Sequence, residues 1–255
     1  MLKMLLSSLA LCILAGCASQ PVASSLVEQH MQARGGSAAV HAVRSIELQL
    51  DIVEPGFKLK GDYVANRSNC MRIDIFSPDG QYLQSEGVST EGGWAVSSGD
   101  KAFSPQAEGG TQALLHGIDN PLRLTGLDEF RGKGHRLAIV GRKTIGDSAF
   151  DEIDVAYADG YTAELYLDPQ THLIARMREH KPMHVAIDPT KQAIETQFSD
   201  YRSVEGLQIP FFSREVNWET GKELGHTTVR SVLLDSANAE AACTRPELPR
   251  TQSPA

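Results

Sequence analysis

The sequence is poor in positive charge. Lys and Arg total 24 against 32 Asp and Glu, so the net charge is −8 and the isoelectric point is about 5.5. A protein that binds nucleic acid needs a basic face to neutralise phosphates, and anionic lipid head groups attract clusters of Lys and Arg. The composition therefore argues against a nucleic-acid partner and against a polybasic membrane-binding patch.

The common motifs of catalysis and metal binding are also missing. Ser37, Ser89 and Ser148 each have the first Gly of a Gly-x-Ser-x-Gly elbow but lack the second. Pro182 lies between His180 and His184, which excludes the helical two-histidine zinc motif. Phosphate-binding loops and dinucleotide fingerprints are absent as well. We therefore expect a non-enzymatic protein with no metal and no cofactor.

Long apolar runs are missing, with one short exception. A membrane-spanning helix needs about 20 apolar residues, and the run from Met4 to Leu14, which follows Lys3, is too short to span a bilayer. A short apolar run behind a cation is typical of a signal peptide. We therefore assign residues 1–16 to a signal peptide and leave them out of the fold.

The signal sequence ends in Leu14-Ala15-Gly16-Cys17, which resembles the bacterial lipobox. The resemblance implies that signal peptidase II cuts before Cys17, that the thiol carries acyl chains such as palmitate, and that residues 17–24 form a lipidated tether. Ala18 follows the cysteine, and by the same resemblance this favours the outer membrane, with the protein facing the periplasm. The alternative is an ordinary secretory signal cleaved after Ala18.

Cysteine is scarce, and two of the four cysteines lie in the N-terminal signal peptide and lipobox. Cys12 leaves with the signal peptide and Cys17 is the expected lipidation site. Cys70 and Cys243 remain, and the periplasm permits disulfides. The two could form a bridge between the C-terminal tail and an early strand, or both could be free and buried.

What the sequence has in abundance is alternation of apolar and polar residues. Residues 25–33 and 37–43 are expected to be helical, after which the period changes from 3.6 to 2. About eleven strands follow, separated by hairpin-type turns such as Asp159-Gly160, with no helix of crossover length between them. The alternation that indicates them occurs in twelve segments, near residues 46–52, 57–65, 71–75, 81–88, 94–97, 136–140, 153–157, 161–167, 173–179, 194–201, 207–218 and 227–234.

This pattern predicts a mainly β protein with a few helices. One apolar face on each strand makes a single antiparallel sheet curl around an interior. The alternation stops between Ser104 and Phe130, where a helical turn or two near Ala113–His116 and several leucines form an apolar segment. We expect an incomplete antiparallel β-barrel over residues 25–236, with an N-terminal helix, a helical or loop lid, and a flexible tail at 237–255.

Several motifs resemble the outer-membrane lipoprotein-sorting proteins, which are LolA/LolB-like. They are His30-Met31-Gln32-Ala33-Arg34-Gly35-Gly36, Met71-Arg72-Ile73-Asp74, Glu91-Gly92-Gly93-Trp94, Leu165-Tyr166-Leu167-Asp168-Pro169-Gln170-Thr171, Asp200-Tyr201-Arg202 and Gly206-Leu207-Gln208-Ile209-Pro210-Phe211. The resemblance spans roughly residues 25–235. It implies an incomplete barrel, closed by helices, whose concave face holds acyl chains.

The expected function is therefore binding of lipid or lipoprotein acyl chains, in lipid or lipoprotein trafficking in the cell envelope. An acyl cavity needs only apolar side chains with space between them. Candidate lining residues are Leu48, Leu50, Ile73, Ile75, Trp94, Leu114, Leu115, Leu165 and Leu167. The alternative is a non-enzymatic envelope scaffold or accessory subunit in which the same residues form a filled core.

Overall fold

The computed structural model describes residues 22–184, 188–237 and 239. The expected signal peptide, Cys17 and most of the tether and tail lie outside the described residues. Among the described residues, no helix is long and apolar enough to cross a membrane. Cys70 is bonded in a disulfide, whereas Cys243 lies outside the described residues, so the pairing of these two cysteines stays a prediction.

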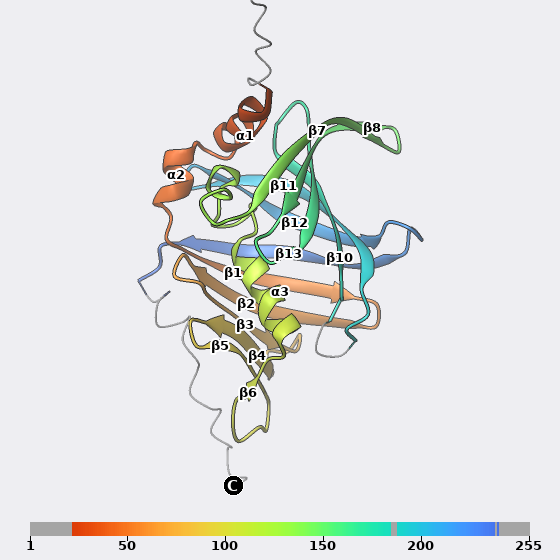
Figure 1. Ribbon diagram of the computed structural model, residues 1–255. Helices are drawn as coiled ribbons and strands as arrows, with labels where there is room; N and C mark the ends of the chain where they lie inside the picture. The colour runs from red at the N-terminus through yellow and green to blue at the C-terminus, as the bar shows by residue number, and fades with distance from the viewer. Residues whose placement is uncertain (1–21, 185–187, 238, 240–255) are drawn as a thin grey trace, which may run out of the picture.

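The described chain consists of thirteen strands, three α-helices and one 3₁₀ helix (Figure 1). The helices are α1 (Val22–Ala33), α2 (Ser37–Ala42), α3 (Glu108–Ile118) and η1 (Leu127–Glu129). The strands are β1 (Ser45–Glu54), β2 (Phe57–Asn66), β3 (Cys70–Phe76), β4 (Tyr82–Ser89), β5 (Gly92–Ser97), β6 (Ser104–Pro105), β7 (Arg136–Ile145), β8 (Ser148–Ala156), β9 (Thr162–Leu167), β10 (Ile174–Lys181), β11 (Gln192–Val204), β12 (Leu207–Asn217) and β13 (Glu223–Leu234).

All thirteen strands belong to one antiparallel sheet that does not close. Its order is β6-β5-β4-β3-β2-β1-β13-β12-β11-β10-β9-β8-β7, so β6 and β7 are the two free edges. Every neighbour is the next strand along the chain except β13, which pairs with β1. This confirms the expected incomplete antiparallel barrel with an N-terminal helix.

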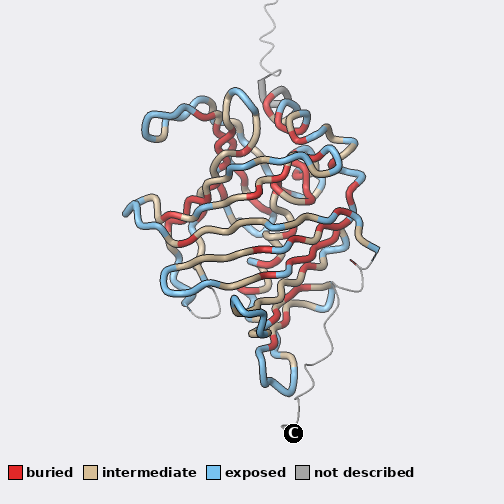
Figure 2. Tube along the Cα trace, turned by 180° about the vertical axis from the view of Figure 1, so that it is seen from behind, coloured by how far each residue is buried: buried red, intermediate tan, exposed pale blue. Residues whose placement is uncertain are grey.

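The alternation in the sequence gives the sheet a concave face and an outer face. Ile46, Leu48 and Leu50 on β1 are at most 5% exposed and belong to the main hydrophobic cluster, while Gln49 between them is exposed. Figure 2 shows buried stretches along the strands and exposed turns between them. Side chains that share a face with Leu48 and Leu50 through the strand pairing therefore define the concave face.

Gly35 fixes how α1 sits on the sheet. It has a φ of +121°, and a Cβ at this position would lie 2.4 Å from the carbonyl oxygen of Gly206 in the β11–β12 turn. Beside this close approach, the Gln208 N–H at the start of β12 donates a hydrogen bond to the carbonyl of Arg34, with an N–O distance of 3.0 Å. Only glycine fits both the conformation and the close approach.

Residues 108–135, which we call the plug, run from β6 to β7 and lie against the concave face. In Figure 1, α3 (yellow-green) crosses in front of the early strands. Six apolar side chains of the plug are 0–7% exposed: Leu114, Ile118, Leu122, Leu124, Leu127 and Phe130. The expected lid therefore exists, and it is packed into the interior of the half-barrel.

Two details differ from the sequence-based expectation. The helix in the plug is longer than a turn or two, because it begins at Glu108 and includes Gly109 and Gly110. Gly93 on β5 allows this packing, since a Cβ there would lie 2.3 Å from the Thr111 hydroxyl oxygen. The sheet also contains a strand that was not expected, the two-residue β6, and β7 and β8 are longer than expected because they form a hairpin that extends through 141–152.

Candidate functional site on the concave face

Most of the predicted lining residues lie together on the concave side. Leu48, Leu50, Leu114, Leu165 and Leu167 belong to one buried cluster, and Ile73 and Leu115 pack against it while remaining half-buried. Ile75, also half-buried, pairs with Gly61, which in turn pairs with Leu50, so it shares their face.

Trp94 differs from the other candidates. It pairs with Gly87, which pairs with Arg72, and Arg72 pairs with Val64. This register places Trp94 on the outer face, outside the main cluster, where its ring packs edge-on against Phe103 with centroids 5.4 Å apart. Trp94 therefore does not line the concave side.

The concave face is filled where the plug covers it. Leu124, Leu127 and Phe130 are each at most 2% exposed, and Leu165 and Leu167 on β9 are equally inaccessible. Close packing of this kind leaves no room for an acyl chain beneath the plug unless the plug moves.

Away from this filled part, several apolar side chains of the concave face remain half-buried. We call five of them the apolar strip: Ile52, Ile73, Leu115, Phe198 and Val229. The floor of the strip is Gly61 on β2. A Cβ at Gly61 would lie 3.3 Å from Ile52 Cδ1 and 3.6 Å from Ile73 Cδ1. The methyl groups of Ile52 and Ile73 therefore already cover Gly61, and a larger side chain at this position would push them aside.

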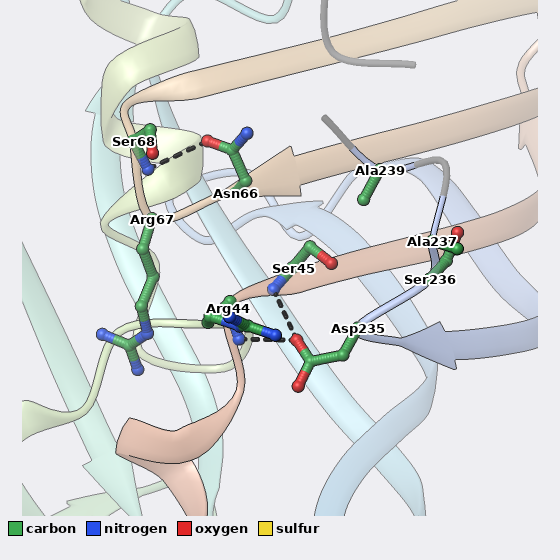
Figure 3. A pocket seen from close by; sticks show the side chains of 9 residues that line it. All are labelled: Arg44, Ser45, Asn66, Arg67, Ser68, Asp235, Ser236, Ala237 and Ala239. Atoms are coloured by element: carbon green, nitrogen blue, oxygen red, sulfur yellow. Dashed lines mark hydrogen bonds between the residues drawn. The ribbon is translucent and has the colours of Figure 1, made fainter. Parts of the chain in front are cut away.

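Two surface pockets lie outside the strip. One, of about 360 Å³, is at the start of β1 and the end of β2 and is lined mainly by polar residues, with Asp235 accepting hydrogen bonds from the Arg44 and Ser45 N–H groups at 2.7 and 3.0 Å (Figure 3). The other, of about 400 Å³, is lined mostly by outer-face residues such as Asp62 and Arg72. Both pockets are lined in part by charged residues, which makes them less suitable for hydrocarbon than the strip.

The plug is tied to the rest of the molecule by Arg34, at the end of α1. This side chain is 1% exposed, and its guanidinium donates to the backbone carbonyls of Pro121, Arg123 (2.8 Å) and Thr125 (3.4 Å). Burial lowers the pKa of Arg34 to about 10, so the group is still charged at neutral pH. A cation that meets three carbonyl oxygens orders the whole 121–125 segment.

Arg67, just after β2, ties the plug a second time. It donates to the carbonyls of Val40, Val43 and Leu124 at 2.6–2.8 Å and to the Glu129 carboxylate at 2.6 Å. The other Glu129 oxygen accepts the Gly126 N–H at 2.6 Å. Arg67 therefore joins α2, β2 and the plug in one network.

Histidine–carboxylate pairs add further ties. His116 on α3 lies 2.8 Å from Asp159 in the β8–β9 turn, and its ring stacks on Tyr161 with centroids 4.3 Å apart. His41 on α2 lies 3.1 Å from Asp128 on η1. The plug is thus held at several points along its length.

One histidine group among the described residues has a spacing that could suit a metal. The ligand atoms of His41, Asp128 and Glu129 all lie within 4.8 Å of one another. Both Glu129 oxygens already accept hydrogen bonds from Arg67 and Gly126, so we assign no metal to this group. His180 and His184 are apart: His180 packs against Trp218, and His184 lies 2.8 Å from Glu54.

Sequence reasoning missed Arg34, Arg67 and Gly61. The two arginines look like ordinary cations in the sequence, and only the fold places them against backbone carbonyls. Gly61 carried a weak signal, because an isolated glycine within a strand pattern marks a close approach or a gap in the face.

Comparison with solved structures identifies the fold. The chain resembles a LolA superfamily protein from Nitrosomonas europaea (TM-score 0.58, 10% identity, 88% of this chain and 97% of that one). It also resembles a DUF1329 family protein from Desulfovibrio piger (TM-score 0.54, 10% identity, 87% and 98%). A putative outer membrane lipoprotein-sorting protein domain from Vibrio parahaemolyticus is similar as well (TM-score 0.52, 10% identity, 86% and 98%).

Comparison at the level of sequence finds nothing further. No family model matches the chain, and no curated protein matches it. The structural similarity confirms the resemblance inferred from the sequence motifs, at the level of the fold. The chain has a LolA-like fold.

Proposed function

We propose that this chain, which has a LolA-like fold, is a lipid-anchored protein of the outer membrane that binds acyl chains on its concave face. It would take part in lipid or lipoprotein trafficking on the periplasmic side. The proposed anchor is Cys17, and the proposed ligand is the hydrocarbon part of a lipid or lipoprotein. No covalent step is needed.

The observation that carries the proposal is the half-buried apolar strip on the face that the plug covers only in part. Ile52, Ile73 and Leu115 offer hydrocarbon to solvent next to a fully buried cluster. Each methylene buried there gains about 0.8 kcal/mol. A chain with about ten buried methylenes would gain about 8 kcal/mol before the cost of immobilising it.

The plug determines how much of an acyl chain can enter the interior of the half-barrel. Six of its apolar side chains belong to the same buried cluster as residues of β1, β2 and β9, where hydrocarbon would otherwise be received. We infer that an acyl chain first binds on the apolar strip. A longer acyl chain would enter the interior as the plug moves away from the concave face. Release of the plug requires breaking the contacts of Arg34 and Arg67. An incoming chain would replace the lost apolar contacts of the plug with its own.

The same packing favours a second candidate. If the plug never leaves, the chain is an envelope scaffold or accessory subunit with a filled core, and the strip is a small exposed surface. The two candidates differ in one measurable property, namely saturable binding of a free acyl chain.

Titration of a fluorescent fatty acid, 11-(dansylamino)undecanoic acid, into purified Cys17→Ala protein tests the proposal. Gly61→Leu would displace the Ile52 and Ile73 side chains of the strip, so we expect binding to weaken by up to about tenfold. Gln49→Leu adds the same side chain at an exposed outer-face position of β1 and is the matched control. No saturable binding to the parent protein, or equal binding to both variants, would contradict the proposed site and favour the scaffold.

A further inference from the structure

A cation of the plug faces the concave side without an anionic partner. The Arg123 guanidinium carbon lies 4.0 Å from the centroid of the Tyr63 ring. Among the described residues, the Arg123 side chain forms no ion pair and no hydrogen bond. It is half-buried between Leu122 and Leu124, which are both buried. A guanidinium offers five N–H donors, so Arg123 retains an unused capacity to bind an anion.

The Tyr63 hydroxyl is a second unused donor in the same place. Tyr63 is 2% exposed, and its hydroxyl oxygen is buried with no hydrogen-bond partner. Buried hydroxyl groups are rarely left unpaired, and each exception calls for an explanation such as a ligand. Tyr63 pairs across β2 and β3 with Ile73, so this hydroxyl group adjoins the apolar strip.

Lys181 at the end of β10 is a further cation of the concave face, because it alternates in phase with Met177, which pairs with Leu165. Its Nζ lies 2.8 Å from a Glu179 oxygen, and its side chain is 32% exposed. Burial and the nearby Arg123 lower the pKa of Lys181, but Glu179 and Glu215 more than offset this and raise it, so the ammonium group is charged. Glu179 is also bound by the Tyr161 hydroxyl at 2.7 Å. The charge of Lys181 is therefore partly shared, whereas that of Arg123 is not.

We propose that Arg123 and the Tyr63 hydroxyl bind the anionic head group of a single-chain lipid whose hydrocarbon lies on the apolar strip. The head group would be a carboxylate or a phosphate monoester, since both accept two parallel hydrogen bonds from a guanidinium. This inference rests on the proposed function and specifies its ligand class. The carboxylates of Glu179 and Glu215 would repel an anionic head group near Lys181. The main contact of the head group is therefore expected at Arg123.

Three probes with the same 18-carbon chain separate head group from hydrocarbon: oleate, 1-oleoyl lysophosphatidate and oleyl alcohol. Native mass spectrometry or competition with the fluorescent fatty acid would give their dissociation constants. We expect the Cys17→Ala protein to bind at least one anion about tenfold or more tightly than the alcohol, as expected for a charge-assisted contact. The stronger of the two anions identifies carboxylate or phosphate as the preferred group.

The variant Arg123→Gln should remove this preference and leave binding of oleyl alcohol unchanged. Tyr63→Phe keeps the ring under Arg123 and should reduce the preference in part. Arg131→Gln, an exposed arginine on the same plug, is the control and should behave as the parent. Thermal unfolding of each variant shows whether it is folded.

Two results would overturn the inference in different ways. If the parent binds oleate, lysophosphatidate and oleyl alcohol equally, or if Arg123→Gln keeps the preference, the head-group site is wrong while acyl binding stands. If none of the three probes binds, the head-group site fails together with the proposed function.

Discussion

The Arg34 side chain and the Arg123 backbone are joined by a hydrogen bond of 2.8 Å between residues 89 positions apart. Arg34 directly follows the first helix, and Arg123 lies in the middle of the plug. The bond therefore connects the segment that closes the concave face to the helix nearest the expected membrane anchor. Any motion that opens the face has to break it.

Loss of Arg67 should loosen the plug. Arg67→Met leaves the Glu129 carboxylate and the carbonyls of Val40, Val43 and Leu124 without their donor, so we expect a destabilisation of about 3 kcal/mol. Urea unfolding measures it. Hydrogen exchange should accelerate most at residues 119–130. Arg214→Met, in the exposed pair with Glu223, should cost less than about 0.5 kcal/mol. Equal effects from both variants would contradict the assigned role of Arg67.

His30 should make the protein less stable in acid. Burial, followed by the nearby Arg34 charge, lowers the pKa of His30 from 6.5 to about 4. The folded state therefore keeps the neutral ring, and the stabilisation is complete above pH 6.5 and is lost as the pH falls towards 4. The expected loss is about 3 kcal/mol. Chemical unfolding between pH 7 and 4 measures it, and His30→Gln should flatten that part of the profile. An unchanged profile in the variant would refute this assignment.

Gly35 and Gly36 provide a comparison of strain with and without a close contact. Both have positive φ angles, +121° and +95°, but only a Cβ at Gly35 would clash with the Gly206 carbonyl. Gly36→Ala should cost about 1 kcal/mol from backbone strain alone. Gly35→Ala should cost at least 2 kcal/mol more, because the β11–β12 turn has to shift. Thermal unfolding of the two variants decides the matter, and equal losses would show that the contact is unimportant.

Much of the fold could be predicted from periodicity. The alternation in Ile46–Ile52, the glycines after α1 and the Asp159-Gly160 turn each specify local geometry through rules that act over a few residues. Those rules predicted a single curled antiparallel sheet and an apolar segment at 104–130, the family resemblance implied that the sheet does not close, and the structure has all three features.

The contacts that close the site could not be predicted in the same way. Alternation distinguishes the two faces of a strand but does not identify the concave one. Trp94 lies on the outer face because it pairs with Gly87, whose position in the register belongs to that face. Arg34, Arg67 and Tyr63 have roles that depend on residues many positions away. No local pattern encodes such contacts.

The central claim is that hydrocarbon binds on the concave face, and photo-crosslinking tests it most directly. A fatty acid with a diazirine at the end of its chain would be photolysed with the Cys17→Ala protein, and the labelled peptides mapped by mass spectrometry. We predict label at Ile52, Ile73, Leu115 or Phe198, and less of it in Gly61→Leu. Label confined to the outer face around Asp62 and Arg72, or no label on folded protein, would contradict the account.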